Sequence, residues 1–190
     1  PTPTPLPTPT SLPTLVPTPT PTATPGPTPT PTPIAAGTCI SSWGTLGSGP
    51  SEFDYPYGIA VSDSGYVYVA DRSNNRIQKF NLSGVYVTEW STRAYEVAAD
   101  SANNIFVTGN GSSVRKFNST GSLLLEWGDA GTGDGQFETD TVGVAIDSSG
   151  NVYVSSDSRV QKFDASGNFI LGWGSNGTGD GQFRSSDGIG

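Results

Sequence analysis

The sequence predicts an all-β fold made of four-stranded antiparallel units, and two observations carry that prediction. Residues 143–173 contain four short apolar segments, VAI, VYV, VQKF and FILGW, separated by connections rich in Gly, Asn, Asp and Ser. Val and aromatic side chains favour pleated strands, and short polar connections favour antiparallel neighbours. Nearly the same segment occurs twice upstream, and its beginning occurs again near the end. Each copy is therefore expected to form one antiparallel meander.

The first 36 residues differ in composition from the rest and are expected to form a disordered, extended linker. Fourteen of the sixteen prolines lie in residues 1–33, where Pro alternates with Thr, and every charged residue follows that segment. Such a chain buries no core. We expect polyproline II at ~3.1 Å per residue, which gives a stalk of roughly 100 Å. Thr-Pro richness is also typical of O-glycosylated stalks, so we expect an extracellular or cell-surface location.

Residues 37–190 are long enough for one folded domain and are strongly acidic. The net charge is −8 and the isoelectric point is about 4.2. Nucleic-acid binders present a basic face, so we expect no RNA or DNA partner. No apolar run reaches the ~18 residues of a membrane span. Cys39 is the only cysteine, which precludes an internal disulfide, and we expect it to lie in the core.

The length of the repeat favours the blades of a β-propeller. The tryptophans are spaced 47, 37 and 46 residues apart, at Trp43, Trp90, Trp127 and Trp173. Lys-Phe pairs recur with spacings of 37 and 46 residues, ending at Phe80, Phe117 and Phe163. Four-stranded repeats of this length are typical of propeller blades. One blade cannot bury both of its faces alone, and packing between blades explains a strand such as VYV, which has no polar residue.

Several motifs in fixed order carry a family resemblance. GQF, GIAVS, VYVADRSNNRIQKF, a Gly turn and a strand ending in Trp together resemble the NHL repeat, most closely at residues 53–80 and 137–163. The resemblance covers about residues 37–190 and implies a propeller, commonly six-bladed in that family. It implies a partial ring with these parts: a blade at 53–90, a shortened blade at 91–127, a blade at 137–173 and the start of another at 183–190. A closed ring would need residues beyond Gly190.

A set of aromatic, glycine and aspartate residues is expected to hold equivalent structural places in the repeats. They are Trp43, Phe53, Gly58, Asp71, Phe80, Trp90, Phe117, Trp127, Phe137, Gly143, Phe163, Trp173 and Phe183. Residues 38–44 resemble only the outermost strand of a blade. We expect this lone strand to close the ring by joining the final blade, which would cover an edge that otherwise promotes aggregation. Because the chain also lacks Met, we interpret it as part of a longer protein.

The turn between the second and third strands varies among the copies. The first blade has Asp71 and Arg76 there, whereas the second has Gly and Ser at the two positions. The joint loss of both residues predicts that they form an ion pair across the turn. The third blade has Ser156 at the position of the aspartate but keeps Asp157 and Arg159 nearby.

These turns also supply the candidate binding residues, which are polar and lie on connections that vary between blades. They are Arg72, Asn74, Asn75, Arg76, Asp157 and Arg159. The DRSNNR turn could bind an anion or a carboxylated partner. The alternative is structural, with Asn supporting the turn and Arg76 pairing with Asp71.

The sequence indicates no metal site, no cofactor and no catalytic residue. The loops GDAGTGDGQF and GSNGTGDGQF contain Asp129, Asp134 and Asp180 among glycines. Calcium loops need oxygen ligands at alternate positions, but Gly131 and Gly133 follow Asp129 at those positions. The chain has no histidine, which excludes Ser-His-Asp and Cys-His chemistry and the usual zinc sites from it.

The leading functional hypothesis is a non-catalytic binding or scaffolding module of an extracellular or surface-attached protein. It would recognise a protein or carbohydrate partner through propeller loops. One alternative is a propeller lyase or hydrolase whose channel residues lie in blades beyond Gly190. Another is the sensor ectodomain of a membrane signalling protein, which a kinase or membrane segment before Pro1 would favour.

Overall fold

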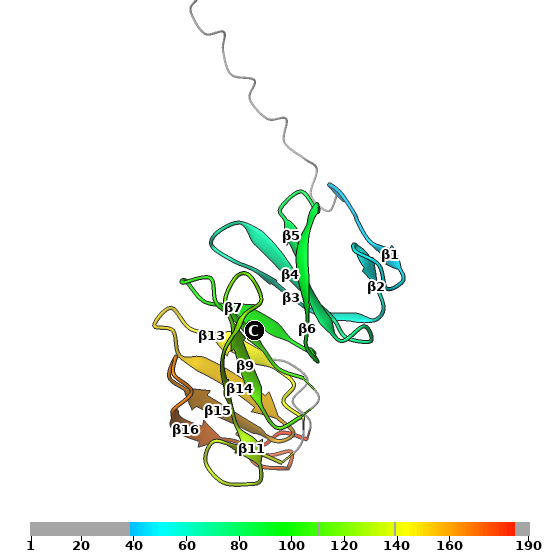
Figure 1. The fold of residues 1–190 in the computed structure, drawn as a ribbon. Helices are drawn as coiled ribbons and strands as arrows, with labels where there is room; N and C mark the ends of the chain where they lie inside the picture. The colour runs from blue at the N-terminus through cyan, green and yellow to red at the C-terminus, as the bar shows by residue number, and fades with distance from the viewer. Residues whose placement is uncertain (1–38, 110, 139, 185–190) are drawn as a thin grey trace, which may run out of the picture. The chain divides into compact units, whose positions relative to one another are not determined.

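The computed structural model describes residues 39–109, 111–138 and 140–184, and it confirms the all-β class (Figure 1). No helix occurs in this part of the chain, so none that could span a membrane is found there. Three four-stranded antiparallel sheets follow one another along the sequence. The expected linker at residues 1–36 and most of the expected new blade at 183–190 lie outside the described residues.

Each sheet is a meander in which the strand order follows the chain order. The first blade consists of β3 (Pro56–Val61), β4 (Tyr66–Asp71), β5 (Arg76–Asn81) and β6 (Tyr86–Ser91). The second blade consists of β7 (Val97–Ala99), β8 (Ile105–Val107), β9 (Val114–Phe117) and β10 (Leu123–Trp127). The third blade consists of β13 (Val144–Ile146), β14 (Val152–Ser156), β15 (Arg159–Phe163) and β16 (Phe169–Trp173).

The Gly-rich connections contain short parallel pairs that sequence reasoning did not predict. They are β1 (Thr45–Leu46) with β2 (Glu52–Phe53), and β11 (Asp129–Ala130) with β12 (Gln136–Phe137). A bridge between Asn176 and Phe183 has the same place after the third blade. Each pair closes a loop whose last residue is a phenylalanine, so the loop holds that ring against the neighbouring blade.

Polar turn residues set the register of the strands. Asp147 follows β13 and accepts hydrogen bonds from the amides of Ser149 and Asn151, both at 2.9 Å. The Asn151 side chain donates to the other oxygen at 2.7 Å, and these bonds lower the pKa of Asp147 to about 2, that side-chain bond contributing most. Asn118 and Asp164 accept amide hydrogen bonds in the same pattern. A side chain that replaces backbone partners in this way stabilises a tight turn.

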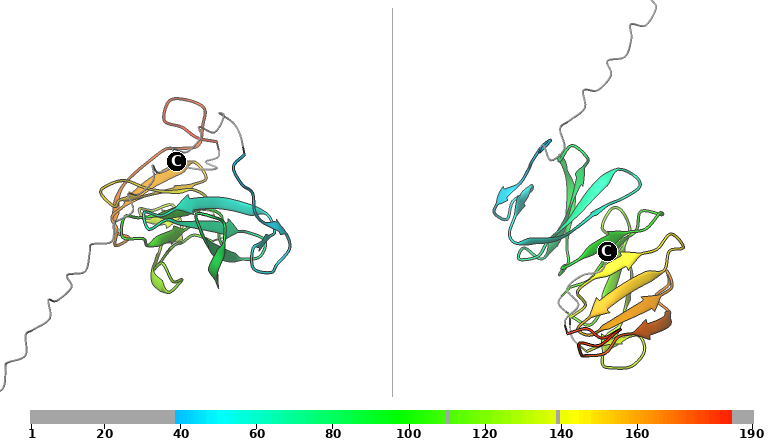
Figure 2. Two further views of the ribbon diagram at one scale, coloured as in Figure 1. Left: turned by 90° about the horizontal axis from the view of Figure 1, so that it is seen from above. Right: turned by 180° about the vertical axis from the view of Figure 1, so that it is seen from behind.

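The core lies between the sheets, as expected of stacked blades. The inner strand β7 contacts both β3 and β13, so the first strands of the three sheets lie side by side (Figure 2). The buried residues between the first and second blades are Tyr68, Ala70, Ile77, Ala94, Val97, Ile105, Val107 and Phe117. Those between the second and third are Phe106, Val114, Phe137, Val144, Val152, Val154 and Phe163. Both faces of β4 are covered, because Val67 and Val69 form a separate cluster with Phe80 on the opposite face.

Tryptophans connect successive blades. The ring centroids lie 5.8 to 6.3 Å apart in three pairs, Trp43–Phe80, Trp90–Phe117 and Trp127–Phe163. Each indole also covers a turn glycine, at Gly84, Gly121 and Gly167. A Cβ atom there would lie within 2.9 Å of the indole, so only glycine fits beneath the ring. The recurring tryptophans and phenylalanines are therefore packing residues.

The segment before the first blade matches the expectation only in part. Trp43 contacts Phe80 as the other tryptophans contact theirs, but residues 39–44 form no strand in the structure. An outer strand needs a neighbour to exchange hydrogen bonds, and the described residues provide none for this segment. The ring-closing strand at 38–44 stays a prediction. The expectation that Cys39 lies in the core is wrong, because its side chain is exposed.

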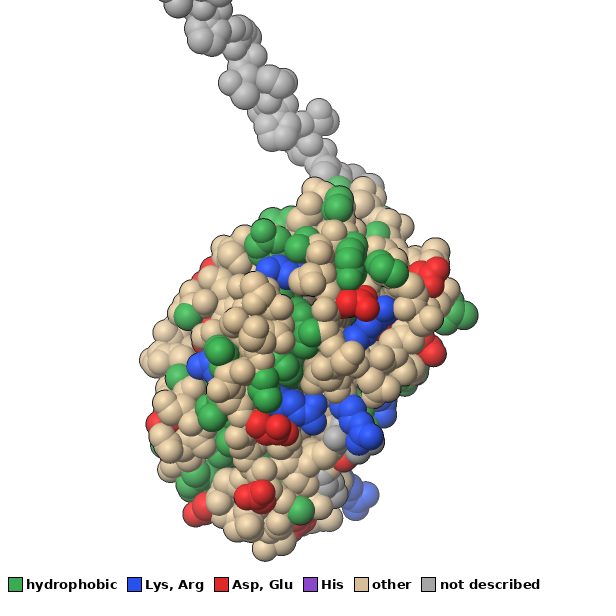
Figure 3. Space-filling view, viewed as in Figure 1, with side chains coloured by type: hydrophobic (Ala, Val, Ile, Leu, Met, Phe, Trp, Pro, Cys, Tyr) green, Lys and Arg blue, Asp and Glu red, His purple; other side chains and the backbone are tan. Residues whose placement is uncertain are grey.

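The described residues cover the two outermost sheet faces only in part, and both faces expose apolar side chains. Ile59 on the first blade is 62% exposed, and Trp173 on the third blade is 40% exposed. Trp173 holds the position that Trp90 and Trp127 hold in their blades, where a following blade covers them. On the face shown in Figure 3, acidic and basic side chains lie close together, with hydrophobic side chains among them.

We predict that residues 37–190 expressed alone self-associate, because exposed apolar sheet faces favour association. Ile59→Lys should lower the self-associated fraction measured by light scattering, since it places a charge on the open face of the first blade. Leu82→Lys is the matched control, because Leu82 is 63% exposed but lies in a turn. A monodisperse monomer with cooperative unfolding would contradict the prediction.

Candidate functional site

The turn between β4 and β5 and the first residue of β5 hold four of the predicted binding residues, and three of them support the fold. The Asn74 amide donates to the Gly47 carbonyl at 2.9 Å and to the Asp71 carboxylate at 2.9 Å. Asn75 has a left-handed backbone with φ of 51°, a conformation that Asn tolerates, and its carbonyl accepts the Thr92 amide. Arg76 is buried. These three residues fix the turn.

The buried carboxylate of Asp71 is the centre of this network. Its side chain is fully buried and forms an ion pair with Arg76, with 2.8 Å between Nε and Oδ2, which confirms the predicted pair. It also accepts hydrogen bonds from the Asp54 amide at 2.8 Å and the Gln78 side chain at 3.1 Å. Because a buried charge is tolerated only when it is paired and hydrogen-bonded, this arrangement holds the first blade together.

The remaining residue of the turn, Arg72, lies against three tyrosines. Its Cζ atom is 4.1 Å from the ring centroid of Tyr95 and 5.5 Å from those of Tyr55 and Tyr57. Tyr55 is 60% exposed and Tyr57 is 42% exposed. We call these four residues the Arg72–tyrosine surface. The negative faces of the rings attract the guanidinium and hold it in place.

The Arg72–tyrosine surface combines residues from two blades. Tyr57 lies in β3 of the first blade, whereas Tyr95 precedes β7 of the second, and their ring centroids are 6.2 Å apart. The Tyr95 hydroxyl donates to Asp140 at 3.3 Å. Sequence reasoning identified Arg72 but not the tyrosines. The YPYG segment was the available signal, since two tyrosines so close together are rarely both buried.

A half-buried carboxyl group lies next to this surface. Glu96 follows Tyr95, and burial raises its pKa, partly offset by hydrogen bonds from the amides of Val97 and Ile59. Gly58 permits the close approach of the two blades here. A Cβ atom on Gly58 would lie 2.7 Å from the Glu96 Cα and from the Tyr95 carbonyl oxygen.

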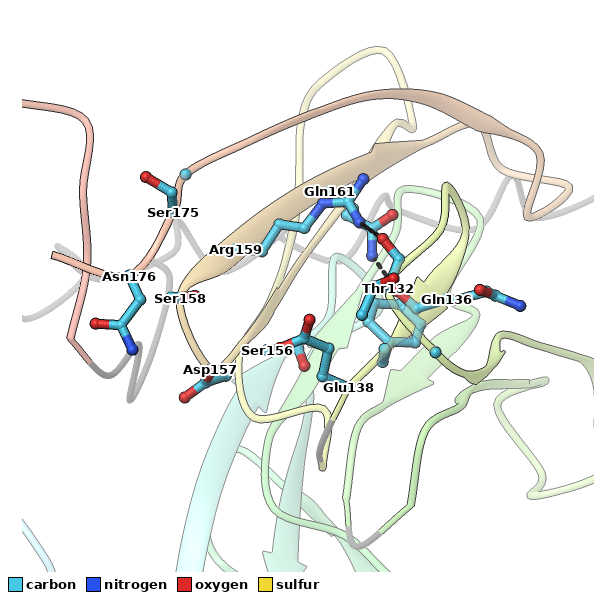
Figure 4. Close-up of a pocket in the computed structure, with 13 residues that line it drawn as sticks. Thr132, Gln136, Glu138, Ser156, Asp157, Ser158, Arg159, Gln161, Ser175 and Asn176 are labelled. Atoms are coloured by element: carbon cyan, nitrogen blue, oxygen red, sulfur yellow. Dashed lines mark hydrogen bonds between the residues drawn. The ribbon is translucent and has the colours of Figure 1, made fainter.

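The other two predicted binding residues, Asp157 and Arg159, line a polar pocket in the third blade (Figure 4). The cavity has a volume of about 310 Å³. They do not pair with each other: Arg159 bonds Asp134 at 2.8 Å, and Asp157 has a left-handed φ of 50°. Figure 4 shows Arg159 and Gln161 along one side of the pocket, with Ser156 and Glu138 on the other.

Asp134 forms an ion pair with Arg159. In the part of the chain that the structure describes, no group of three or more acidic, Cys or His side chains could hold a metal ion.

Comparison with known sequences supports the resemblance. The family described as NHL repeat matches residues 53–80. Protein lin-41 of Caenorhabditis elegans is 46% identical over 56 residues, which cover 30% of this chain and 5% of that protein. NHL repeat-containing protein 3 of Homo sapiens is 35% identical over 83 residues, covering 43% of this chain and 20% of that protein. The chain thus spans a fifth or less of these relatives.

Comparison with solved structures supports the fold. A streptogramin B lyase structure superposes with a TM-score of 0.53 at 20% identity, covering 66% of this chain and 42% of that one. Virginiamycin B lyase from Staphylococcus aureus gives a TM-score of 0.53 at 19% identity, covering 66% and 43%. At these identities the likeness shows the fold alone, which is that of a β-propeller.

We predict that Asp71→Asn destabilises the protein by about 3–5 kcal/mol, because it leaves the buried Arg76 without its charge partner. The free energy of unfolding in urea measures the effect. Asp63→Asn removes an exposed acid from a neighbouring turn and should change that energy by less than ~0.5 kcal/mol. Equal stability of the two variants would show that the network does not hold the blade.

We predict that Glu96→Gln stabilises the protein at pH 7. Burial raises the Glu96 pKa in the folded state, so ionisation opposes folding and stability falls as the pH rises through the raised pKa. The difference in unfolding free energy between the variant and the parent should therefore become smaller when the pH falls below 4.5, the ordinary pKa of a glutamate. Urea midpoints at pH 7 and pH 3.5 test this, with Asp63→Asn as the control for removing one acid. A variant less stable than the parent at pH 7 would refute it.

Proposed function

Because residues 53–80 are an NHL repeat in a chain that folds as β-propeller blades, we propose that this protein is a binding or scaffolding module that recognises its partner through its loops. The observation that carries the proposal is the Arg72–tyrosine surface. It contains Arg72, a residue of the predicted DRSNNR site whose side chain lies against tyrosine rings and takes no part in the Asp71 network.

The chemistry of this surface suits a protein or carbohydrate partner. Tyr and Arg are enriched among the residues that contribute most to binding energy, because they offer a large rigid area with a polar end. The contacts among Arg72 and the three rings also fix the side chains before a partner arrives, which lowers the entropic cost of binding. A peptide can pack on the exposed rings and accept hydrogen bonds from Arg72, and a sugar ring can stack on the same rings.

The proposed setting is extracellular or at a cell surface. The Pro/Thr-rich residues 1–36 support it, because an extended stalk would hold the blades away from an attachment point. The net charge of −8 favours a partner other than nucleic acid.

A lyase or hydrolase remains the second candidate, because the solved structures that superpose on this chain include two lyases. This chain contributes no histidine. The catalytic groups of such an enzyme would come from blades beyond Gly190, as expected for that alternative.

We predict that Arg72→Ala and Tyr57→Ala each weaken partner binding by at least ~30-fold, which corresponds to the ~2 kcal/mol of a dominant contact. Arrays of peptides and glycans, probed with the whole chain, would supply the ligand, and biolayer interferometry would give the dissociation constants.

Leu124→Ala is the matched control, because Leu124 is 53% exposed on β10, outside this surface. It should leave the dissociation constant unchanged. Unchanged binding by both Arg72→Ala and Tyr57→Ala would place the recognition surface elsewhere and refute the proposal.

A further inference from the structure

A second arginine lies beside the Arg72–tyrosine surface. Arg93 is two residues before Tyr95, in the segment that connects the first blade to the second. Thr92 and Ala94 are buried, whereas Arg93 is exposed and Tyr95 is half-buried. This alternation places the side chains of Arg93 and Tyr95 on the solvent side of the segment. Because residues two apart in extended chain lie about 6.6 Å from each other, Arg93 adjoins the ring on which Arg72 lies.

Hydrogen bonds from the second blade hold this segment in place. Nη1 of Arg115 donates to the Thr92 hydroxyl at 2.7 Å and to the Arg93 carbonyl at 3.3 Å. The Tyr95 amide donates to the Thr108 carbonyl at 2.7 Å. The exposed side chain of Arg93 therefore extends from a fixed backbone.

The guanidinium groups of Arg72 and Arg93 remain available to a carboxylate. Three arginines of the blades form ion pairs with acidic side chains, and these are Arg76, Arg115 and Arg159. Among the described residues, no ion pair and no side-chain hydrogen bond is found for Arg72 or Arg93. A tyrosine ring attracts a guanidinium without using up its five N–H donors. Both arginines can therefore donate charge-assisted hydrogen bonds to an anionic group of a partner.

The rings beside Arg72 offer apolar area but no flat platform. The ring planes of Tyr55 and Tyr57 are inclined by 31°, and those of Tyr57 and Tyr95 by 46°. Successive sugars of a glycan stack best on rings that are nearly parallel. Tilted rings instead suit the side chains of a peptide, which leave the backbone in different directions.

Carboxylates near the surface restrict how many charges the partner can carry. Asp54 is exposed beside Tyr55. Asp140 accepts the Tyr95 hydroxyl at 3.3 Å and the Gly111 amide at 3.0 Å. A dense polyanion would meet these acids as well as the arginines, and the net charge of −8 would slow its approach. A partner with only two carboxylates, set close together, avoids most of that repulsion.

We propose that Arg93 and the Arg72–tyrosine surface together bind an extended acidic peptide with carboxylates on alternate residues. Side chains two residues apart in an extended peptide lie on the same side, about 6.6 Å from each other, which matches the separation of Arg93 and Tyr95. One carboxylate accepts hydrogen bonds from Arg72 and the other from Arg93. Neighbouring side chains of the peptide pack on Tyr55 and Tyr57. This inference rests on the proposed function and names the partner of that surface.

Blocked peptides with Glu-Val-Glu or Gln-Val-Gln at their centre test the inference by biolayer interferometry with the whole chain. The Glu-Val-Glu peptide should bind at least ~10-fold more tightly, because only carboxylates form charge-assisted hydrogen bonds with both arginines. Added NaCl should weaken its binding. Equal binding of the two peptides, or binding of neither, would overturn the inference. Tighter binding of trigalacturonate, a carbohydrate that carries carboxylates, would overturn it as well.

Arg93→Gln distinguishes a failure of this inference from a failure of the proposed function. It should weaken Glu-Val-Glu binding at least ~10-fold without changing the midpoint of thermal unfolding, since the residue is exposed. Lys162→Gln is the matched control, because it removes the same charge from the third blade, where Lys162 lies 3.7 Å from Asp147. It should leave peptide binding unchanged.

The variants give a clear answer for each hypothesis. If Arg72→Ala and Tyr57→Ala weaken binding of a ligand from the arrays but Arg93→Gln does not, the proposed function stands and the acidic-peptide inference fails. If Arg93→Gln and Lys162→Gln weaken Glu-Val-Glu binding equally, the attraction is a general effect of charge and the inference also fails.

Discussion

Packing of each tryptophan on the following blade is the interaction on which the rest of the structure depends. A four-stranded sheet this small cannot bury both faces, so each blade is stable only against a neighbour. The indole of Trp90 fills the space between its own sheet and Phe117, and the turn at Gly121 leaves room for the ring. Trp127 repeats this arrangement with Phe163. The recurring tryptophans and phenylalanines therefore serve packing between blades.

The first and third blades have different residues at one equivalent buried position. The first blade fills it with Asp71, which neutralises Arg76 and satisfies the donors around it. The third blade has Ser156 at this position, and Arg159 pairs with the exposed Asp134. A pocket of about 310 Å³ lies beside Ser156 in the third blade.

Rigid blades also explain how Arg72 can be partly exposed and yet fixed in position. Tyr57 and Tyr95 belong to neighbouring blades, and the close contact at Gly58 fixes the distance between them. The guanidinium then lies on preformed rings. A partner-binding surface built in this way needs no rearrangement of the backbone, which is consistent with recognition through loops on a rigid scaffold.

The sequence by itself determined the meanders, the order of the blades and the Asp71–Arg76 pair, because strand alternation, turn chemistry and internal repetition are local signals. It also identified Arg72, Asp157 and Arg159 as polar turn residues. Only the tertiary structure decided that Asn74, Asn75 and Arg76 are structural, that tyrosines from two blades surround Arg72, and that the third blade has a pocket. Those outcomes depend on distances between segments far apart in the chain, which packing between sheets sets and no local pattern encodes.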